Sequence, residues 1–266
     1  GLGTGASSFG QFMFSPLAIG LNQALNWHTT LLIFAGIVLV MMPLSLALAR
    51  PRELSESGPA APAQSVREAL REAMSHRSYM LLVLGYFTCG FQLFFITIHL
   101  PTYLVDRGLS VEVGAWTIGI IGLFNILGSI GSGWLANRMP KRFLLAAIYA
   151  LRSVVILVFI LVPPTPLTSM LFGAVMGVLW LSSVPPTQAL VAVMFGTRWL
   201  TMLAGLAFFS HQVGGFLGVW LGGILYERTG SYDVVWYLTI LLGLFAAVIN
   251  LPIVEKPVTR AVAAPS

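Results

Sequence analysis

The sequence predicts an all-α membrane protein, and two observations carry that prediction. First, 57% of the 266 residues are hydrophobic and only 9% are charged, and the mean hydropathy is +0.89. A soluble domain carries about 25% charged residues, and a soluble core of this size could not bury such an apolar excess. Second, the apolar residues form long runs, each close to the roughly 20 residues that a helix needs to cross a bilayer. Lipid is therefore expected to be the solvent for much of the surface.

Eight such runs follow one another along the chain, separated by breaks that carry charges or turn-forming residues. Strands are not expected, because the runs lack a two-residue alternation and are far longer than the about 10 residues of a membrane β-strand. Most breaks are so short that neighbouring helices must be antiparallel. The predicted spans are residues 1–24, 29–49, 78–103, 113–136, 143–162, 167–194, 199–225 and 233–254.

Residues 50–77 form the one clear shift in composition, with five arginines and four glutamates around a segment rich in proline, alanine, serine and glycine. Residues 65–68 are typical of a helix start, because a serine is followed three positions later by a glutamate that can cap it. Val66, Leu70 and Met74 then fall on one stripe, so a short amphipathic helix on the membrane surface is one interpretation. A fully solvated linker is the other.

The basic residues are distributed unevenly between the two sides of the predicted spans. When the breaks are numbered alternately, eleven of the fourteen lysines and arginines fall on one side, and Arg107 and Arg228 fall on the other. Basic residues are enriched in cytoplasmic loops, so the linker and the carboxy-terminus are predicted to be cytoplasmic. Their scatter along the chain argues against nucleic acid as a partner, although the net charge is +5.

The start of the chain and its single cysteine also limit the possibilities. Gly1 lies inside an apolar run without an initiator methionine, so we expect further helices of the same protein before it. Cys89 has no second cysteine with which to form a disulfide inside the chain.

The break after the fourth span carries the most specific motif. From Gly133 to Arg142 it reads Gly-Trp-Leu-Ala-Asn-Arg-Met-Pro-Lys-Arg, which includes Asn137, Arg138 and Lys141. This segment resembles the Gly-x-Leu-Ala-Asp-Arg-x-Gly-Arg-Arg signature in cytoplasmic loops of the major facilitator superfamily. Glycine permits close helix approach, and the basic residues can bond helix ends or acidic partners at the cytoplasmic leaflet. The resemblance implies a gating loop, but asparagine replaces the usual aspartate and removes the charge for an ion pair.

Four other stretches are similar to parts of the monocarboxylate-porter-like bacterial branch of that superfamily, namely residues 26–28, 98–108, 182–198 and 210–232. The resemblance implies helices five to twelve of a twelve-helix carrier built from two bundles, in a bacterial inner membrane. Substrate in such carriers binds between the bundles, so the missing amino-terminal helices of the same protein would complete the site. The implied parts are the last two helices of the amino-terminal bundle, a cytoplasmic linker, the carboxy-terminal six-helix bundle and a cytoplasmic tail, at residues 1–49, 50–77, 78–254 and 255–266.

Polar residues inside the spans are candidates for the substrate path, because such residues are costly in lipid and often functional. Arg152 is the only charged one, and it could bind an anion, act as a gate, or bond helix carbonyls or a neighbour. None of the nine acids lies well inside a span, so no carboxylate proton relay is expected in this part of the protein. The other candidates are Gln92, His99, Asn125, Trp180, Ser183, Gln188, His211 and Gln212.

A plain structural role is the alternative for each candidate. His99 could titrate or sit at the interface, Asn125 could bind substrate or a neighbouring helix, and His211 could be functional or could only pack. Pro185 and Pro186 are predicted to break the sixth span and to release backbone carbonyls at membrane depth. We interpret this kink as a moving part.

The leading functional hypothesis is a secondary transporter for a small solute. The resemblance implies an organic anion such as a monocarboxylate, with proton coupling left open. A drug or metabolite efflux carrier of the same superfamily is the closest rival. A membrane-embedded enzyme is the alternative from another class, but no metal-binding or phosphate-binding motif is present. No cofactor and no metal are expected, and the predicted partners are the lipid bilayer and the solute.

Overall fold

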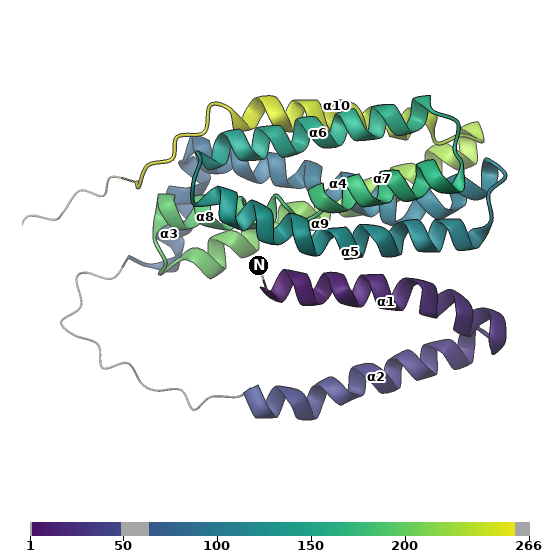
Figure 1. Ribbon diagram of the computed structural model, residues 1–266. Coiled ribbons are helices and arrows are strands. Elements are labelled where there is room, and N and C mark those ends of the chain that lie inside the picture. The colour runs from purple at the N-terminus through teal and green to yellow at the C-terminus, as the bar shows by residue number, and fades with distance from the viewer. Residues whose placement is uncertain (1, 49–63, 259–266) are drawn as a thin grey trace, which may run out of the picture.

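The computed structural model describes residues 2–48 and 64–258, and the regular elements within them are all helices (Figure 1). Each predicted span except the sixth coincides with one helix, with ends that agree to within four residues. The sixth span is divided into α7 and α8. The first part of the predicted linker and the end of the tail lie outside the described residues. The helices are α1 Leu2–Ala24, α2 Trp27–Leu48, α3 Val66–Ser75, α4 Arg77–Asp106, α5 Val111–Ala136, α6 Lys141–Leu161, α7 Pro166–Leu179, α8 Val184–Phe195, α9 Leu200–Thr229 and α10 Asp233–Asn250.

Within the described residues, six segments are long and apolar enough to cross a membrane. They are α4, α5, α6, α9, α10 and the combined segment Pro166–Phe195, whereas α2 contributes a shorter apolar helix, Trp27–Met41. Large apolar side chains remain on the outside, and Leu127 is 64% exposed, Leu161 68% and Phe216 64%. An apolar exterior of this kind is stable in hydrocarbon and not in water. The chain is therefore an integral, multi-pass membrane protein.

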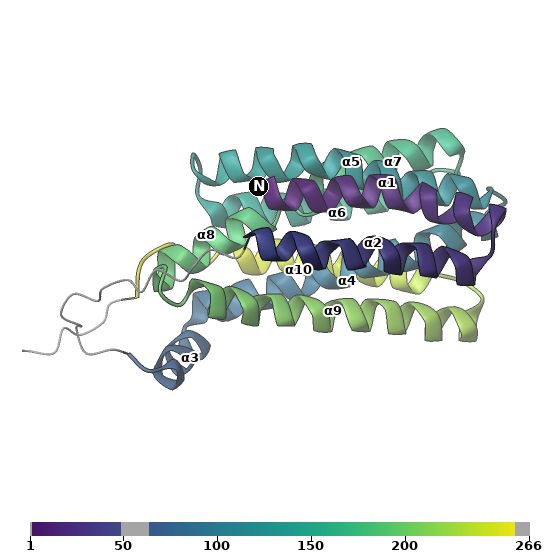
Figure 2. The same ribbon diagram turned by 90° about the horizontal axis from the view of Figure 1, so that it is seen from below.

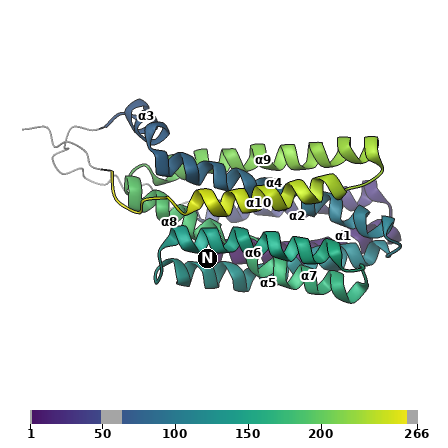
Figure 3. The same ribbon diagram turned by 90° about the horizontal axis from the view of Figure 1, so that it is seen from above.

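Three helix pairs build the bundle formed by α4 to α10: α4 with α9, α5 with α7, and α6 with α10 (Figures 1 and 3). Glycines make the first two contacts close. A Cβ atom added at Gly214 or Gly218 of α9 would collide with the backbone of α4, and one added at Gly173 or Gly177 would collide with that of α5. Small residues let helix backbones approach in membranes, where van der Waals packing drives association.

The α1–α2 hairpin lies beside this bundle, with α1 running along α5 (Figures 1 and 2). Gly119 of α5 faces the backbone of Phe12 and the ring of Pro16. Near the end of α1, the Gln23 amide donates a hydrogen bond of 3.0 Å to the Glu112 carboxylate in the first turn of α5. The hairpin thus contacts the larger bundle mainly through α1.

Residues 253–258, which we call the C-terminal strap, cross the end of the bundle that carries α3. Ile253 is fully buried, and the backbone N–H of Val254 donates to the Ser78 hydroxyl at the start of α4 (3.0 Å). The N–H of Val258 donates to the carbonyl of Met194 at the end of α8 (2.9 Å). The strap therefore ties helices together that are far apart in the sequence.

The short helix α3 begins as the sequence predicts. The Ser65 hydroxyl accepts from the backbone N–H of Glu68, and the Glu68 carboxylate accepts from the N–H of Ser65 (2.7 Å). Ala69 and Ala73 are buried against the bundle, whereas Val66 and Met74 are about half exposed. The helix thus packs on protein through its alanines and leaves two apolar side chains uncovered.

Candidate functional site

A break between α7 and α8 lies at the centre of the candidate site. The helix was expected to be interrupted at Pro185 and Pro186, but the irregular residues are 180–183, just before the prolines, which occupy the first turn of α8. Proline is tolerated in a first helical turn because the N–H that it lacks has no intrahelical partner there. The break therefore lies about one helical turn closer to the amino terminus than the prolines at which it was expected.

Two fully buried side chains satisfy three of the backbone groups that the break exposes. The carboxamide oxygen of Asn125, on α5, accepts a hydrogen bond from the Leu181 N–H (2.9 Å). The Arg152 guanidinium, on α6, donates from Nε to the Leu179 carbonyl (2.9 Å) and from Nη2 to the carbonyls of Leu179 and Trp180. Unsatisfied backbone groups are costly in a membrane interior, so these bonds explain why the break is stable.

Arg152 has further partners behind the break. Its Nη1 donates to Cys89 Sγ (3.3 Å), and its Nη2 lies 3.4 Å from Ser183 Oγ. Cys89 Sγ and Ser183 Oγ are 3.2 Å apart. No described carboxylate forms an ion pair with Arg152, so carbonyl dipoles rather than a counterion stabilise its charge.

A cavity of about 560 Å³ opens beside this network, between α4, α8 and α9. Among the lining residues in the described part of the chain there is no acid. The polar and aromatic ones come from all three helices. The lining comprises Tyr86, Leu181, Val184, Thr187, Gln188, Leu200, Thr201, Ala204, Gly205, Phe208 and His211.

His211 is the one basic residue among the described residues that line this cavity, and 4% of its surface is exposed. Its Nδ1 lies 3.2 Å from Gln212 Oε1, which is an acceptor, so Nδ1 carries a hydrogen. Its Nε2 is buried without a hydrogen-bond partner. The rings of Tyr86 and Phe208 lie 5.0 and 5.4 Å from the imidazole and hold it in place. Nε2 is thus an acceptor in the neutral ring and a donor in the protonated one.

The structure brings some of the predicted residues together and separates others. Ser183, Gln188 and His211 belong to the cavity or to the network directly behind it, together with Arg152. Trp180 contributes its carbonyl rather than its buried ring to that network.

Three predicted residues lie elsewhere. The Gln92 amide donates to the Thr239 carbonyl of α10 (3.1 Å), which is a helix-to-helix bond. His99 bonds to the Val219 carbonyl (2.9 Å) and the Tyr232 hydroxyl (3.3 Å) near the opposite end of the bundle from α3. The Gln212 side chain lines a separate shallow hollow with Phe94, Phe216 and Trp220.

The loop motif forms a polar hollow of about 530 Å³ with the C-terminal strap. Glu255 of the strap accepts from the Arg142 backbone N–H (2.8 Å) and lies 3.8 Å from Lys141 Nζ. The Arg138 guanidinium stacks on Trp134, and the Asn137 amide donates to the Gly133 carbonyl (3.3 Å). The acidic partner of the loop in the described residues is therefore Glu255, and Asn137 serves as a local helix cap.

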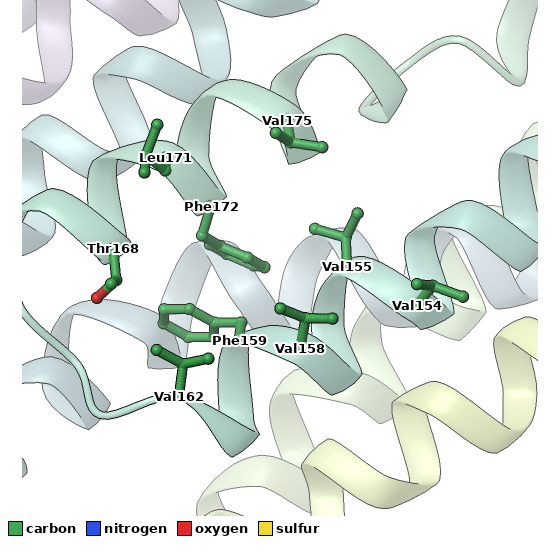
Figure 4. A pocket seen from close by; sticks show the side chains of 9 residues that line it. All are labelled: Val154, Val155, Val158, Phe159, Val162, Thr168, Leu171, Phe172 and Val175. Carbon is green, nitrogen blue, oxygen red and sulfur yellow. The ribbon is translucent and has the colours of Figure 1, made fainter.

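Figure 4 shows a contrasting pocket between α6 and α7. Its volume is about 300 Å³, and its wall consists of valine, leucine and phenylalanine side chains with Thr168 as the single polar one. A charged solute would lose its hydration there without gaining partners. This pocket is therefore not a candidate for a polar substrate.

Sequence reasoning missed Cys89, Thr201 and Phe208 as parts of the site. Thr201, Ala204, Phe208 and His211 recur at helical spacing and share one face of α9, and this periodicity could have identified them. No signal in the sequence identifies Cys89, because its role depends on the Arg152 side chain of α6 reaching α4. Within the described residues, no group of three or more histidine, cysteine or acidic side chains could hold a metal ion.

Known proteins share both the sequence pattern and the fold of this chain. The model of the family described as Major Facilitator Superfamily matches residues 1–219. The MFS-type transporter YcxA of Bacillus subtilis is 28% identical over 268 residues, which cover 95% of this chain and 63% of that protein. Monocarboxylate transporter 11 of Mus musculus is 28% identical over 241 residues, which cover 87% of this chain and 53% of that transporter. The chain thus spans only part of the length of these relatives.

Solved structures agree at the level of the fold. The transporter FucP in its outward conformation aligns with a TM-score of 0.59 and 17% identity, over 85% of this chain and 55% of that one. The Escherichia coli fucose:proton symporter FucP gives a TM-score of 0.60 and 16% identity, over 86% and 57%. Both the relatives and the structural neighbours are transporters.

Proposed function

Since the chain belongs to the Major Facilitator Superfamily, we propose that it is part of a secondary transporter that moves a small organic anion by alternating access. The chain would supply the six-helix bundle of residues 78–254, two helices of the other bundle, and the linker between them. The membrane would be the cytoplasmic membrane of a bacterium, with the linker and the carboxy-terminus on the cytoplasmic side. The carrier would move the solute without changing it chemically.

One observation carries the anion proposal: the cavity between α4, α8 and α9 contains a buried imidazole with a free Nε2 and no described carboxylate. The buried positive charge of Arg152 lies behind the same wall. A site with cationic groups and no acid favours an anion, since charge interactions are strong where water is excluded. The name of one relative, monocarboxylate transporter 11, makes monocarboxylates the first class to test.

The geometry of His211 supports coupling to protons. With Nδ1–H directed at Gln212, the neutral ring offers only a lone pair at Nε2 and cannot donate to a carboxylate. Protonation converts Nε2 to an N⁺–H donor, and a charge-assisted hydrogen bond to a carboxylate is about twice as strong as a neutral one. Proton and anion would therefore bind together. One structural neighbour is a fucose:proton symporter, which is consistent with such coupling.

The test is uptake by the complete carrier in proteoliposomes, with a panel of small carboxylates and with or without a pH gradient. We expect one or more carboxylates to accumulate with the gradient. His211→Gln should raise KM about tenfold or more, which corresponds to the loss of one hydrogen bond to a charged group. His76→Gln is the matched control, since His76 also has a buried ring nitrogen without a partner but does not line the cavity.

Other outcomes would overturn parts of the proposal. If no carboxylate moves, the anion assignment is wrong, and neutral and cationic compounds should be tested as substrates of an efflux carrier. If uptake proceeds equally without the gradient, His211 is not the coupling group.

A further inference from the structure

We infer that Asn125 and Arg152 are positioning residues that together hold the α7–α8 break and so set the orientation of α8 in the cavity wall. We call this pair the break splint. Its functional importance rests on the proposed function, because the cavity is the proposed substrate site. The role of the pair in holding the break does not depend on the proposed function, so the structural role and the transport function can be tested separately.

The break needs such a pair because its backbone N–H and carbonyl groups cannot all find hydrogen-bond partners within the backbone. Pro185 and Pro186 have no N–H to continue the helical ladder. The chain turns instead, with Trp180 N–H donating to the Gly177 carbonyl and Val184 N–H to the Leu181 carbonyl, each at 3.0 Å. Among the backbone groups that this arrangement leaves without backbone partners are the Leu181 N–H and the carbonyls of residues 179 and 180.

The break splint supplies the missing hydrogen-bond partners from two different helices. Asn125 of α5 supplies the acceptor for the Leu181 N–H, and Arg152 of α6 supplies donors for the carbonyls of Leu179 and Trp180. Both side chains are fully buried. A guanidinium presents several N–H groups in a fixed plane, so it can serve two successive carbonyls at once.

The same contacts indicate that Arg152 does not bind the solute directly. Each of its three nitrogens already has a partner, and none of its surface is exposed. Its influence passes through α8 instead. Val184, Thr187 and Gln188, which line the cavity, follow directly after the break, so a change in its geometry moves this wall relative to His211 on α9.

The first experiment is hydrogen–deuterium exchange of the complete carrier, read from peptides that cover residues 178–184. We expect Asn125→Leu and Arg152→Met each to accelerate exchange there by about tenfold or more, because buried backbone groups lose their partners. Arg152→Lys, which keeps the charge and part of the donor capacity, should restore part of the protection. Ser153→Ala is the control, since it removes a buried bond from α6 to the Ile240 carbonyl of α10 and not to the break.

The second experiment measures which wall of the cavity moves. In a Cys89→Ser background, cysteines are introduced at Thr187 on α8 or at Ala204 on α9, both of which line the cavity. We expect Arg152→Met to change the rate of maleimide labelling at position 187 and to leave that at position 204 unchanged. General loosening of the protein would change both rates.

The outcomes separate this inference from the proposed function. If Arg152→Met leaves both exchange and labelling unchanged but abolishes carboxylate binding, Arg152 is a substrate ligand and the splint is wrong. If the exchange and labelling patterns appear but no carboxylate is transported, the splint stands and the anion assignment is wrong. If Arg152→Met does not fold, Asn125→Leu and Arg152→Lys decide the question by the same readings.

Discussion

At the scale of single residues, buried polar side chains in this bundle divide into those that hold helices together and those that face the cavity. His99 belongs to the first group, because both of its ring nitrogens have protein partners in α9 and in the turn before α10. His211 belongs to the second, because it lines the cavity and its Nε2 has no hydrogen-bond partner. The sequence alone gives both the same description, a histidine inside an apolar helix.

This difference predicts opposite effects of substitution at the two histidines. His99→Leu removes two buried hydrogen bonds, to the Val219 carbonyl and to the Tyr232 hydroxyl, at a cost of about 0.5–1.5 kcal/mol for each bond. We expect a lower unfolding temperature, measured by fluorescence in detergent, with substrate KM unchanged. A raised KM at an unchanged unfolding temperature would contradict this assignment and place His99 on the substrate path.

The candidate residues could be identified from the sequence because polar groups in lipid are rare, but their partners could not. Arg152 was predicted either to bind an anion or to bond helix carbonyls, and that choice depends on where α6 lies relative to the break. No local pattern encodes that position. Gln92 was a cavity candidate for the same reason, and only the packing of α10 directs its amide to the Thr239 carbonyl.

At the scale of elements, glycine spacing sets how closely α4 and α9 pack. Gly218 faces the backbone of Phe91, whereas Gly223 on the same helix has nothing within 4 Å of an added Cβ. We expect Gly218→Ala to lower stability by about 1–3 kcal/mol through overpacking, and Gly223→Ala to be neutral or slightly stabilising. Thermal unfolding of the two variants side by side measures this difference. Equal unfolding temperatures for the two variants would show that α4 and α9 do not pack closely at Gly218.

The capping box of α3 gives a second prediction at this scale. Hydrogen bonds from the backbone and the hydroxyl of Ser65 lower the pKa of the Glu68 carboxyl group. Because the pKa is lowered in the folded state, the capping box stabilises α3 fully at pH values above the ordinary glutamate pKa of about 4.3. This stabilisation is lost as the pH falls through the lowered pKa of Glu68. At neutral pH, Ser65→Ala should therefore increase tryptic cleavage after Arg67. Ser75→Ala, at the other end of the helix, should not.

The helices themselves were largely predictable, since bilayer thickness imposes a length that the apolar runs reveal. The sixth span shows the limit of that reasoning. Two prolines signalled an interruption but not its position, because the tolerance of a first helical turn for proline let α8 begin at Val184. The site of the break was decided by the neighbours that could satisfy it, Asn125 and Arg152.

At the scale of the whole molecule, the uneven charge distribution predicts the orientation in the membrane. Arg198 and Arg228 flank α9 at opposite ends, and both are exposed. In a Cys89→Ser background, a membrane-impermeant maleimide should label Arg228→Cys in intact cells and Arg198→Cys only after permeabilisation. The reverse pattern would invert the proposed topology.

The C-terminal strap has a consequence for biosynthesis. Residues 253–258 are translated after all the helices that they join, so the contacts with Ser78, Lys141, Arg142 and Met194 can form only once α10 has been made. Until then, the ends of α4, α6 and α8 are free to adjust to one another as each helix enters the bilayer. The strap contacts thus form last in the assembly of the bundle, and a chain that ends before residue 253 would have all the helices without the contacts that join their ends.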